Sequence, residues 1–203
     1  MNARQHTIVA ALRAAPLLLA CLPAVAHVPG AGAGGGFLAG LQHPVLGWDH
    51  LLAMVSVGLW GAILGRPLLL VLPVAFPMLM LAGAAIGIAG IPLPSVEMGI
   101  AASVLLLGLS VLTAWRAPLP AAVALVALFG ILHGHAHGTE LPQSADPAAY
   151  ATGFLIATGL LHLAGIGIGA LWRVPAGRAM VRGLGASIAL AGVWLLAAPA
   201  LGP

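Results

Sequence analysis

The sequence predicts an all-α integral membrane protein, a bundle of six transmembrane helices that follows a cleaved N-terminal signal peptide. Its 203 residues are 62% hydrophobic and only 5% charged, unlike the composition of a soluble domain. After a glycine-rich stretch, the chain divides at proline, glycine and polar residues into apolar segments close to the roughly 20 residues that a spanning helix needs. Arginines lie singly at the ends of these segments and form no basic patch, which argues against nucleic-acid binding.

The first 26 residues are typical of an export signal. Arg4 and Arg13 flank the start of a short apolar core, and Ala24-Val25-Ala26 is a small-x-small cleavage site. An uncleaved first span, or a lipoprotein-type cleavage at Cys21, is the alternative. We expect three regions: a signal peptide at 1–26, a glycine-rich periplasmic segment at 27–43 and a six-helix transmembrane domain at 44–203.

The orientation of the six helices follows from charge. The expected spans are residues 44–64, 67–90, 95–114, 118–137, 148–172 and 179–199. With an exported N-terminus, every arginine of the mature chain falls on the cytoplasmic side, as the positive-inside rule requires: Arg66, Arg116, Arg173, Arg178 and Arg182. Aromatic belts are expected from Trp115 and Trp172 beside these arginines and from Trp48 and Tyr150 at the other end. We therefore expect a multi-pass protein of the bacterial inner membrane, in contact with the lipid bilayer, with a periplasmic mature N-terminus.

The scarce polar residues are rich in imidazole, with eight histidines against four acidic residues. In the expected topology, most of the histidines and acids of the spans lie at the periplasmic ends of the first, third and fourth segments. The residues at this depth are His43, Asp49, His50, Glu97, His133, His135, His137 and Glu140.

Helical geometry predicts which members of the fourth segment share a face. On a straight helix His133 and His137 differ by roughly 40°, and Glu140 lies within roughly 20° of His133. His135 points near the opposite side. We expect the first three to form one stripe.

The first segment needs a break to bring its histidines together. His43 and His50 are seven residues apart and share a face, but about two turns separate them on a regular helix. Both can reach one ion only if the backbone at Pro44 and Gly47 departs from that helix.

His162 stands apart from this group, roughly two-thirds of the way in from the outer end of the fifth segment. Gly165 and Gly169 form a GxxxG motif on the same face, which predicts close packing against a neighbouring helix. This directs His162 into the bundle, where it could mark the next station inward.

Imidazole and carboxylate ligands suit divalent late transition metals, and the order of affinities favours Ni²⁺ over Co²⁺, while Zn²⁺ fits the same ligands. An ion that is transported must also be released, so few strong ligands are expected at each station and no cofactor is expected to be permanently bound. If cleavage follows Ala26, the new α-amine and the imidazole of His27 could capture an ion from the periplasm.

Several candidates also have a structural interpretation. A polar side chain at a helix end lies naturally in the membrane interface, and Glu97 could serve packing or a proton relay. Asp49 and His50 could brace two helices. The interface explanation covers His43, His135 and Glu140, and for His27 the alternative is an incidental place beside the cleavage site.

Three stretches, "HPVLGWDHLLAMVSVGLWG", "LHGHAHGTE" and "GFLIATGLLHLAGIGIG", resemble the HupE/UreJ family of bacterial hydrogenase and urease accessory proteins. The resemblance implies a nickel permease, not an enzyme, that supplies the maturation of a nickel enzyme. It implies metal-handling roles for His43, Asp49 and His50, and makes cytoplasmic nickel chaperones of hydrogenase or urease maturation candidate partners.

Two other functions fit parts of the pattern. A metal-dependent membrane hydrolase would bind zinc through His133, His137 and Asp49, with Glu97 or Glu140 as the base, although the sequence has no HExxH motif. A haem protein would need paired histidines at mid-membrane depth, where the sequence places a single one.

Overall fold

The computed structural model describes residues 36–141 and 146–201, and all regular structure in these ranges is helical. The expected signal peptide, its cleavage site and His27 lie outside the described residues. The elements are α2 (Gly36–Leu46), α3 (Trp48–Leu64), α4 (Leu68–Ile88), α5 (Val96–Thr113), α6 (Leu119–Thr139), α7 (Pro147–Gly169), the 3₁₀ turn η2 (Ala170–Arg173) and α8 (Pro175–Leu201).

Five of these helices are long and apolar enough to cross a membrane: α4, α5, α6, α7 with η2, and α8. Their bounds lie within a few residues of the expected segments because the length of the apolar runs sets them. The first expected span differs. It is the bent pair α2 and α3, which meet at 77° and bring the number of spans to six if they count as one.

The bent pair begins earlier than expected. Residues 36–43, which we placed in the glycine-rich periplasmic segment, belong to helix α2. This helix packs closely on α7, because Gly40 lies directly against the backbone of Tyr150. The glycine therefore serves close helix packing here.

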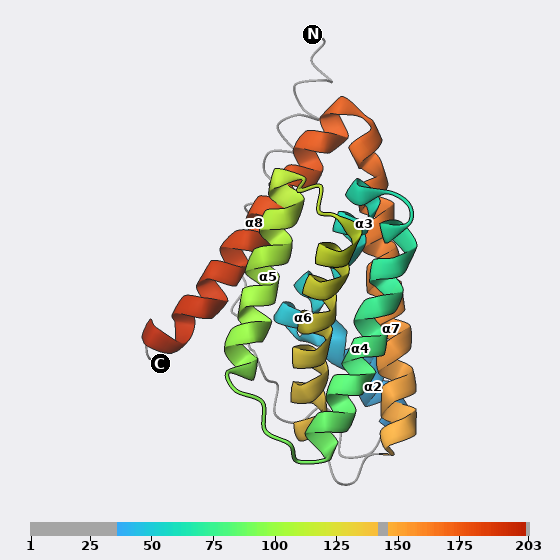
Figure 1. Cartoon of the computed structure of the whole chain (residues 1–203), viewed down its shortest axis with the longest axis vertical. Coiled ribbons are helices and arrows are strands. Elements are labelled where there is room, and N and C mark those ends of the chain that lie inside the picture. The colour runs from blue at the N-terminus through green and yellow to red at the C-terminus, as the bar shows by residue number, and fades with distance from the viewer. Residues whose placement is uncertain (1–35, 142–145, 202–203) are drawn as a thin grey trace.

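The helices associate in close pairs, which Figure 1 shows as neighbouring ribbons: α4 with α6, α5 with α8, and α2 and α3 in succession along α7. Glycines make these contacts close. A methyl group at Gly134 of α6 would collide with the Met80 carbonyl of α4, and one at Gly165 of α7 would collide with the Val55 carbonyl of α3. The close packing expected from the GxxxG motif of α7 is confirmed.

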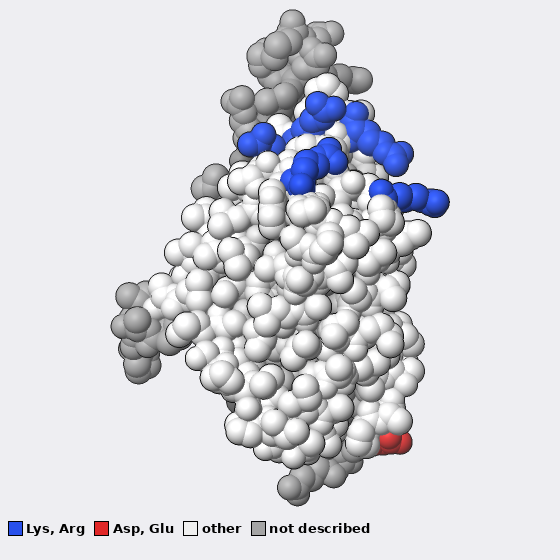
Figure 2. Space-filling view, viewed as in Figure 1, with Lys and Arg blue, Asp and Glu red and all other residues white. Residues whose placement is uncertain are grey.

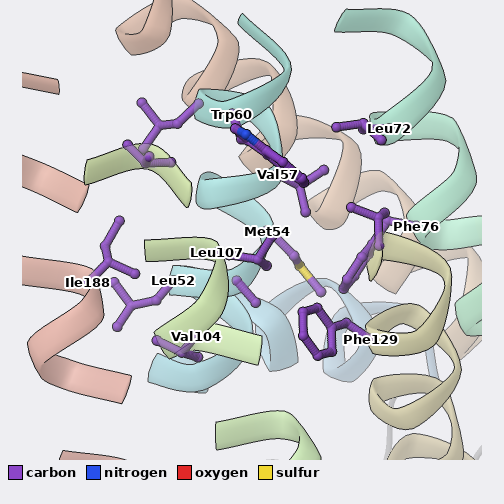
Figure 3. Packing of buried hydrophobic residues seen from close by; sticks show 14 of the residues in the cluster. Leu52, Met54, Val57, Trp60, Leu72, Phe76, Val104, Leu107, Phe129 and Ile188 are labelled. Carbon is purple, nitrogen blue, oxygen red and sulfur yellow. The ribbon is translucent and has the colours of Figure 1, made fainter. Parts of the chain in front are cut away.

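Helix α3 lies at the centre of the bundle. Its buried residues Met54, Val57 and Trp60 pack against α4, α5 and α6, and Figure 3 shows Phe76 of α4 and Phe129 of α6 beside the Met54 side chain. The outward faces are also apolar, as a surface in contact with lipid requires. On α4, exposed side chains include Leu70, Val74, Met78 and Ile88.

Charge divides the molecule into two ends. Figure 2 shows the arginines gathered at one end and an acidic side chain at the other. The arginines occupy the α3–α4 connection, the α5–α6 connection and the region from η2 into α8. We call the half of the bundle at this end the basic half. The other half, which contains α2, the start of α5, the end of α6 and the start of α7, is the acidic half.

Candidate metal site

The site begins at the break between α2 and α3 in the acidic half. His43 lies in the last turn of α2 and His50 in the first turn of α3, with Pro44 inside α2 and Gly47 in extended conformation between the helices (φ −80°, ψ 109°). The bend brings the two imidazole centroids to 5.5 Å, about half of the roughly 10 Å that seven residues span along a straight helix. The expected departure from regular helix around Pro44 and Gly47 is confirmed.

A third imidazole arrives from α6. The ring of His137 lies 4.7 Å from that of His43 and 4.5 Å from that of His50, centroid to centroid. One ring nitrogen from each of the three histidines lies within 4.8 Å of the others. His50 and His137 are buried and His43 is partly exposed. Three ligand atoms this close form a group that could hold one metal ion.

Hydrogen bonds to Asp49 fix the orientation of the His50 ring. Its Nδ1–H donates to Oδ1 of Asp49 at 2.5 Å, and the same oxygen accepts the backbone N–H of His50 at 2.8 Å. In a neutral His50 ring the other nitrogen, Nε2, then carries no proton, and it is buried with no hydrogen-bond partner. A carboxylate behind a histidine orients the ring and makes it a stronger ligand. Asp49 thus acts through His50.

The ring of His133, one turn before His137 on α6, is also held by a hydrogen bond through Nδ1. Its Nδ1–H donates to the carbonyl of Phe129 at 2.9 Å, and its Nε2 is buried and unpartnered. The ring centroid lies 5.1 Å from that of His50. His133 thus lies beside the three-histidine group with one unpartnered ring nitrogen.

The unpartnered nitrogens lower the stability of the folded protein when no ligand is bound. Besides Nε2 of His50 and of His133, both ring nitrogens of His137 are buried without a partner. Each such atom costs about 1–3 kcal/mol when nothing binds it. A divalent cation would offset these costs, and neutral imidazoles can accept one without a change of protonation.

Comparison with known proteins identifies the family of the chain. The HupE / UreJ protein family matches residues 15–195. Protein HupE of Rhizobium leguminosarum bv. viciae is 44% identical over 175 residues, which cover 86% of this chain and 92% of that protein. The chain belongs to the HupE/UreJ family. No solved structure matches it.

The other predicted residues of this HupE/UreJ chain are not part of the three-histidine group. His135 donates through Nε2 to the Ile91 carbonyl at 2.8 Å, which ties α6 to the α4–α5 connection. Glu97 is exposed in the first turn of α5. Glu140 caps the C-terminus of α6, where it is exposed and acts electrostatically on Tyr150.

His162 lies deeper than the cluster, as its position in the fifth segment predicts. It is 1% exposed, and its ring lies 5.7 Å from that of Phe76 on α4. The ring lies near the Pro73 carbonyl of α4, and at least one of its nitrogens has no hydrogen-bond partner. His162 thus points into the bundle.

Two aromatic residues of the site were not predicted. Tyr150, expected in an outer aromatic belt, is instead buried with its ring 6.1 Å from that of His43. Phe154 lies 4.4 Å from His137. Both lie on the face of α7 that carries Thr158 and His162, so the spacing of four residues was the available signal.

A cavity of about 60 Å³, part of it open to the outside, reaches His137 in the acidic half. It lies between α4, α6 and α7 and has a largely apolar lining that includes Met80, Leu141, Tyr150 and Phe154. His137 is the member of the three-histidine group at its wall. The cavity therefore gives access to one histidine of the group.

Proposed function

We propose that this chain is a permease that takes up a divalent transition metal, Ni²⁺, from the periplasm and passes it through the inner membrane for the maturation of hydrogenase or urease. The observation that carries the proposal is the convergence of His43, His50 and His137 on one point, with ring nitrogens buried and unpartnered in His50 and His137. The family of the chain supports the same reading.

The distribution of charge supports the direction of uptake. Loops rich in arginine remain in the cytoplasm, so the basic half is the cytoplasmic one and the imidazole cluster lies toward the periplasm. Glu140 at the end of α6 adds an exposed carboxylate near Tyr150, where it would attract cations to the cavity. The mature N-terminus would lie on this periplasmic side, with His27 as a capture site.

The broken first span is typical of transport sites. Discontinuous helices bring ligands and helix ends to the middle of a membrane in several transporter folds. Here the break places Asp49 in the first turn of α3, where the positive end of the helix dipole stabilises its carboxylate. The ligands of the ion are then neutral imidazoles, which bind Ni²⁺, Co²⁺ or Zn²⁺ firmly and can still release them.

Uptake of radioactive Ni²⁺ by cells that express the chain, with Co²⁺ and Zn²⁺ as competitors, tests the proposal. We expect accumulation above that of cells without the chain and competition by Co²⁺. The double variant that carries both His50→Ala and His137→Ala should lose uptake. Leu163→Ala is the control, because Leu163 is 63% exposed on the outer face of α7. Equal accumulation in cells with and without the chain would contradict the proposal.

Delivery to a nickel enzyme is tested separately. Hydrogenase or urease activity should depend on the chain when external nickel is scarce and become independent of it when nickel is abundant. Cytoplasmic nickel chaperones are the partners expected at the basic end. An activity that never depends on the chain would remove the proposed link to maturation.

A further inference from the structure

On the side of the imidazole cluster that faces the basic half, α7 carries a second pair of polar side chains that lies outside the three-histidine group. Thr158 and His162 are one turn apart on the same face of α7, about 6 Å along the axis, and are 0% and 1% exposed. The Thr158 hydroxyl lacks a hydrogen-bond partner, and the His162 ring, which lies near the Pro73 carbonyl of α4, has at least one nitrogen without one. Buried polar atoms without a partner thus lie one turn apart in the interior of a membrane protein, where such atoms are unfavourable without a ligand.

The Thr158 hydroxyl is unusual for this chain. In the described residues, most helical serines and threonines donate to a carbonyl three or four positions earlier in their own helix, as Thr152 does to Ala148 at 2.7 Å and Ser110 to Leu106 at 2.7 Å. Thr158 does not. Ser56 is the other buried hydroxyl without a partner, but it points roughly 160° away from Gly58, the residue of α3 that packs on α7.

The position of this pair relative to the cluster follows from three ring contacts. Phe154 of α7 lies beside His137, and His162 is two turns further along the same helix, about 12 Å toward the basic half. Phe76 of α4 touches both levels, with its ring 5.5 Å from His133 and 5.7 Å from His162. Figure 3 shows Met54 and Phe129 next to Phe76, so an apolar layer separates the two levels.

From this geometry we infer a second, inner metal station, in which His162 is the main ligand and Thr158 adds a hydroxyl oxygen. An ion that leaves His133 reaches it by passing the ring of Phe76. One imidazole and one neutral oxygen bind a divalent cation more weakly than three imidazoles do, which suits a station that must release its ion toward the cytoplasm. This inference rests on the proposed function.

A cysteine scan with Co²⁺ tests for metal at this position directly. In a Cys21→Ser background, His162→Cys would place a thiolate at the inner station, whereas Leu163→Cys would place one on the outer face of the same helix turn. We expect a sulfur-to-cobalt charge-transfer band in purified His162→Cys loaded with excess Co²⁺, and no such band in Leu163→Cys. Thr158→Cys should give a weaker band. Identical spectra for His162→Cys and Leu163→Cys would overturn the inference.

Transport kinetics separate the inner station from the cluster. His162→Ala should lower the maximal rate of Ni²⁺ uptake at least about tenfold, a typical loss for a metal-handling group, and leave the half-saturating concentration nearly unchanged. Thr158→Val should show a smaller loss of rate, and Thr152→Val, the matched control, none. A normal maximal rate in His162→Ala would overturn the inner station and leave the permease intact. A charge-transfer band in His162→Cys without any Ni²⁺ uptake by the wild type would overturn the permease and leave the inner station.

Discussion

The basic and acidic halves of the bundle differ in whether their buried polar groups have hydrogen-bond partners. In the basic half, long helices pack backbone to backbone at glycines such as Gly165, and the indole N–H of Trp60 is satisfied by the Trp115 carbonyl at 2.9 Å. In the acidic half, the first span breaks at Gly47 and leaves buried imidazole nitrogens without partners. Glycine packing is equally close in the acidic half, as at Gly134, so the two halves differ in their buried imidazole nitrogens, which a cation can use in the acidic half.

The largest effect is expected at the break itself. His50→Ala removes a ligand of the three-histidine group, and Asp49→Asn removes the charge that orients it. Each change should reduce Ni²⁺ accumulation to near background, a fall of about 100-fold. Uptake is measured at matched amounts of protein in the membrane. Near-normal uptake in both variants would mean that the acidic half has no special role.

The second-largest effect compares histidines on different faces of α6. His133→Ala and His137→Ala should each impair uptake strongly because both rings point to His50. His135→Ala should be milder, since it loses one hydrogen bond to the α4–α5 connection, worth about 1 kcal/mol of stability. Uptake assays and thermal unfolding of the three proteins check this order. Equal loss of uptake from all three would show that position along α6, and not the face, decides the role.

A third prediction concerns the geometry of the break. A methyl group at Gly47 would lie 3.0 Å from Nδ1 of His50 and 3.2 Å from Oδ1 of Asp49, so Gly47→Ala should push this pair apart. We expect a severalfold rise in the half-saturating Ni²⁺ concentration with little loss of protein. Gly159→Ala is the control, because a methyl group there meets nothing within 4 Å. Should both variants behave like the wild type, the pair would tolerate displacement and would not be preorganised.

The sequence was informative where one helix decides the outcome. Apolar run length set the bounds of α4 to α8, the 3.6-residue period separated His135 from His133 and His137, and the chemistry of Pro44 and Gly47 indicated the break. These properties are local. They require no knowledge of which helices are neighbours.

The sequence was less informative where neighbours decide. Glu97 lies at the predicted end of the bundle, but α5 packs mainly on α8, and the side chain is exposed away from the three histidines. Tyr150 is at the expected helix end, yet α2 covers it, because Gly40 brings that helix against α7. Depth follows from hydropathy and charge, whereas the direction a side chain faces depends on the order in which helices pack.

The smallest effect is expected far from any imidazole. Asp146 caps α7, accepting the N–H groups of Ala148 and Ala149 at 2.9 and 3.3 Å. Asp146→Ala should lower the free energy of unfolding by about 1 kcal/mol and leave uptake at moderate temperature unchanged. Thermal unfolding of the purified variant measures the loss of stability, and a Ni²⁺ uptake assay measures transport. A strong loss of uptake would show that the acidic end takes part in capture through its charge.

The central claim is that His43, His50 and His137 bind one ion together. X-ray absorption at the nickel edge tests it most directly, on purified protein loaded with less than one equivalent of Ni²⁺ so that the tightest site fills first. The account predicts a shell with several imidazole nitrogens at about 2.0–2.1 Å that loses one imidazole in His137→Ala. A shell made of oxygen alone, or an imidazole count that His137→Ala leaves unchanged, would contradict it.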